Sequence, residues 1–91
     1  MTASLFLRDA DSRLQRMERA IAEQDIAALA SAAHTLKGSA SNLGARHLAS
    51  LCINLEKQAK TGDLPEAANI LLELKGEFQE VARILVEQMQ K

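Results

Sequence analysis

The sequence predicts an all-α protein, an antiparallel up-down-up-down four-helix bundle. Its 91 residues are 47% hydrophobic and 25% charged, which suits one small folded domain with a single core. Trp and Tyr are absent and there are two Phe residues, whereas the helix-favouring Ala, Leu, Gln and Glu are abundant. Four amphipathic segments are separated by very short turns, which place consecutive helices antiparallel.

The first two helices are expected over residues 2–23 and 26–43. Apolar residues recur in both segments at spacings of three and four, as on one face of a helix. They are Phe6, Ala10, Leu14, Met17 and Ile21 in the first segment, and Ile26, Leu29, Ala33, Leu36, Ala40 and Leu43 in the second. Asp25 is suited to cap the start of the second helix, and Gly44 to end it in a left-handed turn.

The other two helices are expected over residues 45–61 and 64–90. Their apolar faces are Leu48, Leu51, Cys52, Leu55 and Ala59 in the third segment, and Ala67, Leu71, Leu74, Phe78, Val81, Leu85 and Met89 in the fourth. Gly62 ends the third helix and Asp63 caps the fourth. Gly76 lies inside the fourth helix, where glycine is unfavourable, and we expect it to permit close packing.

Composition excludes several function classes. The net charge of −1 gives no bulk reason to expect nucleic acid as a partner, and without Trp or Tyr there is no aromatic platform for stacking bases. A single cysteine, Cys52, excludes an internal disulfide, falls on an apolar face and favours a reducing, cytoplasmic location. No apolar run approaches the ~20 residues that span a bilayer, so direct membrane insertion is not expected.

His34 stands out because it lies outside the apolar face of its helix. It follows Ala33 directly and so points roughly 100° around the helix from that face. Small residues and one cation surround it, where a solvent-facing helix normally carries long charged side chains. These neighbours are Ala27, Ala30, Ser31, Lys37, Gly38 and Ser41. An exposed imidazole is a nucleophile near pH 7, and Lys37 could neutralise an anion on it.

The run His34-Thr-Leu-Lys-Gly-Ser-Ala-Ser-Asn-Leu-Gly44 resembles the signature of histidine phosphotransfer (HPt) domains of bacterial multistep phosphorelays. The resemblance covers nearly the whole chain and is closer to the HPt domains of hybrid sensor kinases than to the related domain of the chemotaxis kinase. It implies that His34 accepts a phosphoryl group from an aspartate of one receiver domain and passes it to another. It also implies that Lys37 helps to stabilise the phosphoryl group and that Gly38 gives the receiver room to dock. The docking surface would further include Ala27, Ala30, Ser31 and Ser41.

The resemblance also implies the partners. They are response regulator receiver domains, of a hybrid sensor kinase and of a downstream regulator, and the receiver supplies Mg²⁺ while this chain holds no cofactor. No Gly-rich nucleotide loop is present, so phosphorylation from ATP is not expected. Family members often carry an additional N-terminal helix, so we expect an excised part of a membrane-anchored sensor kinase or a minimal stand-alone form. We expect a monomer, although the helix faces could support self-association.

Family members often place a Gln on the third helix within reach of the histidine, and the corresponding residue here is Glu56. Independently, His34 lies ten residues before Gly44 and Glu56 twelve after it, which places them at the same height on antiparallel helices. A glutamate could orient the ring by accepting its N–H, but it would repel a phosphoryl group. Lys60, one turn on, would partly offset that charge. The sequence leaves two roles open for Glu56: it could orient the histidine ring, or it could form an ordinary surface salt bridge.

Two other function classes remain as alternatives. One is a non-catalytic module that docks a receiver domain or another helix. The other is a metal-dependent helical-bundle enzyme, which would need carboxylate and histidine ligands in the core that the apolar faces do not provide. A zinc site formed by His34, His47 and Cys52 is disfavoured because their spacing matches no common ligand pattern.

Overall fold

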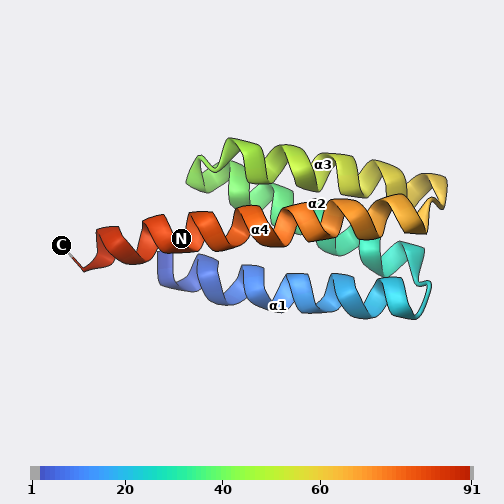
Figure 1. The fold of residues 1–91 in the computed structure, drawn as a ribbon, viewed down its shortest axis with the longest axis horizontal. Helices are drawn as coiled ribbons and strands as arrows, with labels where there is room; N and C mark the ends of the chain where they lie inside the picture. Colours follow the sequence, from blue (N-terminus) through green and yellow to red (C-terminus); the bar gives the residue numbers. More distant parts are fainter. Residues whose placement is uncertain (1–2, 91) are drawn as a thin grey trace.

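The computed structural model describes residues 3–90, which form four α-helices and no strand (Figure 1). The helices are α1 (Ala3–Ala22), α2 (Ile26–Leu43), α3 (Arg46–Thr61) and α4 (Leu64–Met89). Helices α1 and α3 each pack against both α2 and α4, in an up-down-up-down arrangement. The predicted fold class is therefore confirmed. The expected start of the first helix, at residue 2, lies outside the described residues.

No helix within residues 3–90 combines the length and the hydropathy that crossing a bilayer requires.

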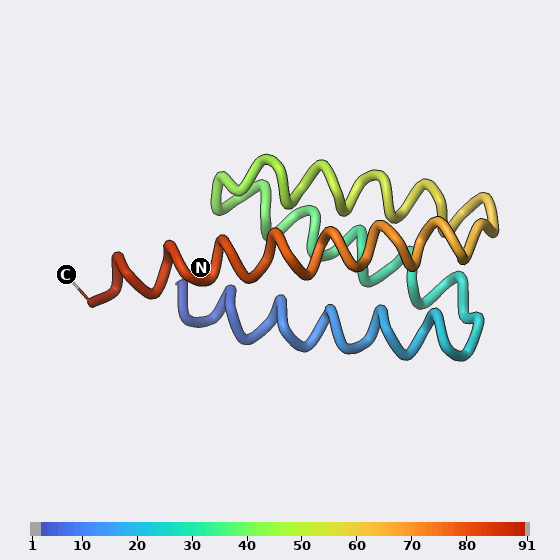
Figure 2. The backbone as a smooth tube through the Cα atoms, in the orientation of Figure 1, coloured from blue at the N-terminus to red at the C-terminus, as the bar shows by residue number. Residues whose placement is uncertain are grey.

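The three turns between the helices share one backbone conformation. Each turn has one left-handed residue, the second after α1 and the first after α2 and α3, with φ of 58° at Gln24, 89° at Gly44 and 81° at Gly62. The N–H of Gly44 donates to the carbonyl of Ser41 at 3.1 Å, and the next N–H donates to that of Ala40 at 2.9 Å. Equivalent pairs of bonds form at the other two turns. These Schellman motifs reverse the chain within a few residues, as the tight bends in Figure 2 show.

Two helices begin with a side-chain cap. The Asp25 carboxylate accepts the backbone N–H of Ala28 at 3.0 Å, and the Asp63 carboxylate accepts that of Glu66 at 3.1 Å. The N-cap of α3 is Ala45, which has no side chain to accept a hydrogen bond. Because Ala45 has non-helical backbone angles, α3 begins one residue later than the sequence suggested.

Most residues of the predicted apolar faces are buried in the core, and several residues outside the prediction are buried with them. The fully or nearly buried side chains include most of the predicted ones, together with Ala20, Ala32, Ala49 and Ile70. Two expectations are wrong: Met89 is 52% exposed and Ile26 is 39% exposed. The C-terminal end of α4 extends beyond the other helices, so Met89 has little to pack against (Figures 1 and 2). Ile26 is the first residue of α2, at the edge of the bundle.

The expectation that Gly76 permits close packing is also wrong. A Cβ atom at this position would meet nothing within 4 Å. Gly76 therefore faces open space on α4, and packing inside the bundle does not require a glycine there.

The turn at Gln24 carries a conformational cost that the two glycine turns avoid, because a Cβ disfavours the left-handed region. Gln24→Gly is expected to raise the free energy of unfolding by about 1 kcal/mol. Gln15→Gly is the matched control, since Gln15 is an exposed residue in the middle of α1. That substitution should lower the free energy by roughly 0.5–1 kcal/mol. Urea unfolding measures both, and a destabilising Gln24→Gly would refute the account of this turn.

Candidate functional site

His34 lies on the exposed side of α2, because the other side of this helix is buried in the core. Ala33 and Leu36 are fully buried, and between them the His34 side chain is 63% exposed. Among the predicted docking residues, the exposed ones are Ala27, Ser31, Gly38 and Ser41. Ala30 is half-buried and packs against the core, so it offers little surface to a partner.

Helix α3 places a carboxylate beside the histidine ring. The Nδ1 atom of His34 lies 3.3 Å from Oε1 of Glu56, at the long end of the hydrogen-bond range. The other carboxylate oxygen, Oε2, lies 3.1 Å from Nζ of Lys60 on the next turn of α3. The two residues lie at the same height on antiparallel helices, as the count from Gly44 predicts. Glu56 therefore contacts the ring and forms a salt bridge at the same time.

The charge state of Glu56 determines the direction of the hydrogen bond. The Lys60 ammonium, and to a lesser extent His34, lower the pKa of Glu56 below its ordinary value of 4.5. The carboxylate is thus ionised at neutral pH and can only accept hydrogen bonds. Nδ1 of His34 must then carry the hydrogen, and in the neutral ring Nε2 holds the free lone pair. Nε2 makes no hydrogen bond to any residue of the described part of the chain.

Lys37 lies on the same face as His34, one turn further along α2. Its side chain is half-buried and forms no ion pair with another residue between positions 3 and 90. It is also the one charged residue of α2, which contains no Asp or Glu. The ammonium of Lys37 is therefore available to an anion that arrives at the ring.

Gly38 lies one turn after His34 and is exposed. A Cβ atom built there would meet nothing within 4 Å, so packing inside the bundle does not require glycine. The absence of a side chain instead lowers the surface of α2 next to the imidazole.

The other nucleophilic and ligating side chains do not form a second site. Burial raises the pKa of the Cys52 thiol to about 12, so this cysteine is an inert part of the core. His47 is exposed in the first turn of α3. Within the described residues, no three His, Cys, Asp or Glu side chains come together as a metal site would require.

Residues 2–84 match the Hpt domain family. This chain belongs to that family. The Hpt domain is also similar to a solved structure, histidine-containing phosphotransfer protein B (HptB) from Pseudomonas aeruginosa PAO1. The two are 33% identical with a TM-score of 0.93, over 96% of this chain and 76% of the other. None of the curated proteins compared with it matches. Family membership supports a role in histidine phosphotransfer within a phosphorelay, in which Hpt proteins work with response regulator receiver domains.

The sequence pointed to site residues on α2 and α3 only. It did not predict that arginines of α1 lie next to this part of α2. Arg13, Arg16 and Arg19 lie beside the face of α2 that carries His34. Their regular spacing of three residues was a visible signal. It did not indicate which neighbouring helix the arginines would face.

The ring geometry leads to a prediction about the tautomer of His34. In alkaline solution, where imidazole is neutral, the hydrogen should reside on Nδ1 because Glu56 accepts it. Glu56→Ala should shift the population toward the Nε2–H form, whereas Glu56→Gln should restore Nδ1–H because the amide oxygen also accepts. The ¹⁵N chemical shifts of the two ring nitrogens report these populations. Unchanged shifts in Glu56→Ala would show that the carboxylate does not orient the ring.

Proposed function

We propose that this Hpt domain is a phosphorelay intermediate in which Nε2 of His34 carries the phosphoryl group. It accepts the group from an aspartate of one receiver domain and passes it to an aspartate of another. The observation that supports this most directly is an exposed imidazole whose Nδ1 faces an ionised carboxylate while Nε2 has no partner in the described chain.

In the proposed forward step, the lone pair of Nε2 attacks the phosphorus of the aspartyl phosphate. The N–P bond forms as the P–O bond to the aspartate breaks, and the aspartate leaves as a free carboxylate. The hydrogen on Nδ1 stays on the ring, so the phosphorylated imidazole becomes cationic. The Glu56 carboxylate, at 3.3 Å, stabilises this cation through the same hydrogen bond. Transfer to the second receiver reverses these changes.

In this proposal two lysines balance the added negative charge. Lys60 already neutralises Glu56 at 3.1 Å, which limits repulsion between that carboxylate and the phosphoryl oxygens. Lys37, which has no ion pair within the described chain, contacts the phosphoryl group in this proposal. Phosphoryl transfer depends mainly on such positioning and charge neutralisation.

We assign Mg²⁺ to the partner because of the donors that surround His34. Glu56 is the carboxylate beside the ring, and it is engaged by Lys60. No cluster of hard oxygen ligands completes a Mg²⁺ site within residues 3–90. In this proposal the receiver brings both Mg²⁺ and the aspartate, and the Hpt domain contributes the nucleophile and the docking surface.

The proposed donor is the receiver domain of a hybrid sensor kinase, and the proposed acceptor belongs to a downstream regulator. The setting would be the cytoplasm, with the domain either free or attached to a membrane-anchored kinase. We propose that it acts as a monomer, since one copy presents His34, Glu56 and Lys37 together.

His34→Gln should abolish acceptance of label from a phosphorylated receiver while leaving the helical circular dichroism spectrum intact. His47→Gln is the matched control and should retain transfer, because His47 lies on the first turn of α3. In the parent protein the label should be acid-labile, as expected for a phosphoramidate. Acid-stable label, or label that persists in His34→Gln, would refute the assignment. A receiver that binds without transferring label to the parent protein would favour the non-catalytic docking module.

Gly38→Arg should obstruct docking, because its side chain would rise from the lowered surface next to His34. We expect kcat/KM for phosphotransfer to fall by at least about tenfold, equivalent to ~1.4 kcal/mol. Gly76→Arg is the matched control, since both are helical glycines whose added Cβ meets open space. Both substitutions should raise the free energy of unfolding by roughly 0.5–1 kcal/mol. Equal transfer kinetics in the two variants would show that Gly38 has no docking role.

A further inference from the structure

A groove lined by arginines runs between α1 and α2 beside the face that carries His34. It has a volume of about 270 Å³ and lies toward the turn that joins these two helices. One wall is formed by Arg13, Arg16 and Arg19 of α1, and the other by Ala28, Ser31 and Ala32 of α2. The wall on α2 has only short side chains, so the guanidinium groups face a shallow, accessible space.

Two of these arginines lack a carboxylate partner. Nε of Arg13 lies 3.5 Å from Oδ2 of Asp9, whereas Arg16 and Arg19 are exposed and pair with no residue in the described part of the chain. Glu23 is the one carboxylate among the lining residues. The groove therefore carries excess positive charge, although the whole chain has a net charge of −1.

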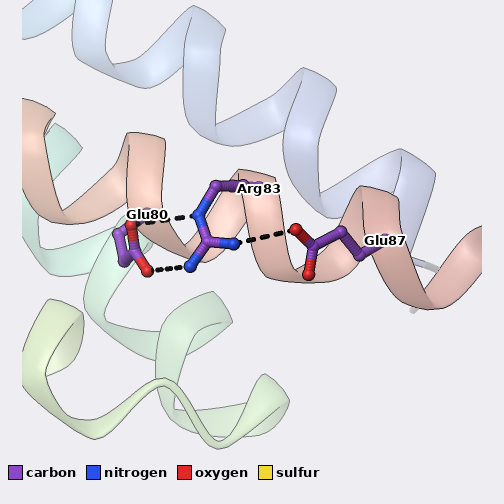
Figure 3. A network of polar contacts seen from close by, with 3 residues as sticks. All are labelled: Glu80, Arg83 and Glu87. Atoms are coloured by element: carbon purple, nitrogen blue, oxygen red, sulfur yellow. Dashed lines mark hydrogen bonds and ion pairs between the residues drawn. The ribbon is translucent and has the colours of Figure 1, made fainter.

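By contrast, both cations of α4 form ion pairs with carboxylates. On α4, Arg83 lies between Glu80 and Glu87, with Nη1 2.8 Å from Oε1 of Glu87 (Figure 3). Lys75 of the same helix pairs with Glu18 of α1. Both cations of α4 are thus neutralised within the chain, whereas Arg8, Arg16, Arg19 and Arg46 have no ion pair in the described residues. Arg16 and Arg19 differ from the other two because they line the same groove. A guanidinium presents a planar fork of donors that matches a carboxylate or a phosphate, and a carboxylate is the matching anion that a protein surface carries.

The groove is continuous with the surface around His34. Ser31 lines it and also lies on the His34 face, three residues earlier on α2. A partner domain that docks over His34 and Ser31 would therefore also reach the arginines next to Ser31. Helix α2 contains no acidic residue that would compete for them.

We propose that the groove binds a carboxylate-bearing segment on the surface of the receiver domain. In this arrangement Arg16 and Arg19 set the affinity and orientation of docking, while His34 and Glu56 perform the transfer. The inference rests on the proposed function, because it names a specificity determinant for the same receiver. Charges at the rim of an interface chiefly change the rate of association and its salt dependence.

The test compares the doubly substituted Arg16→Ala/Arg19→Ala protein with Arg46→Ala. Arg46 is an exposed arginine at the start of α3, at the other end of the bundle from the groove. Arg13 is left intact because it is mostly buried and its Nε lies near Asp9. Three quantities are measured with the receiver domain that binds the parent protein most tightly. They are the dissociation constant from calorimetry and the KM and kcat for transfer of label, each at low and high NaCl.

In the doubly substituted protein, we expect the dissociation constant and KM to rise by at least about tenfold and kcat to change by less than about twofold. Their dependence on NaCl should weaken, and Arg16→Glu/Arg19→Glu should bind more weakly still. Arg46→Ala should behave as the parent protein does. An unchanged dissociation constant, or an equal change in Arg46→Ala, would overturn the groove assignment.

The two hypotheses fail in different ways. If the receiver binds through the groove but transfers no label to the parent protein, the phosphorelay function fails and the docking assignment stands. If label is transferred but Arg16 and Arg19 prove neutral for binding and KM, only the docking assignment fails. If no receiver domain binds the parent protein, both are overturned.

Discussion

The packing of α2 against α3 is the constraint on which the site depends. Both helices bury several small residues, among them Ala33 and Ala40 of α2 and Ala59 of α3. Small side chains let two helix backbones approach closely, and the Schellman turn at Gly44 fixes their register. Only then can a glutamate on α3 reach the imidazole on α2. The polar pair at the surface is thus positioned by apolar packing beneath it.

Much of this arrangement could be predicted from the sequence because the relevant signals are local. The spacing of apolar residues fixed which side of α2 is buried and left His34 outside. The glycines and Asp caps indicated where the chain turns, and a count along antiparallel helices then brought Glu56 to His34. The resemblance of the run after His34 to the HPt signature supplied the chemistry that periodicity alone does not name.

The features that escaped prediction depend on tertiary arrangement or on exceptions to residue preference. Gln24 adopts a left-handed conformation that sequence patterns assign to Gly or Asn. Met89 keeps the apolar spacing of α4 but lies where the helix extends past its neighbours. Gly76 suggested close packing, but the sequence does not show which side of α4 faces another helix. In the bundle this glycine faces open space. The same holds for Arg16 and Arg19, because the sequence does not show that α2 lies beside them.

A phosphorelay intermediate must hold its phosphoryl group without holding it too firmly, because the group has to leave again. Stabilisation that acted only on the phosphorylated state would slow the second transfer as much as it favoured the first. The His34 environment suits such a balance. Glu56 lies beside the unphosphorylated ring, and in the proposed transfer the same carboxylate would contact the cationic ring. Lys60 lowers the pKa of Glu56 and so keeps it ionised in the unphosphorylated protein. The ring itself remains exposed, so the strongest stabilisation of the transferring group can come from the receiver that is docked at that moment.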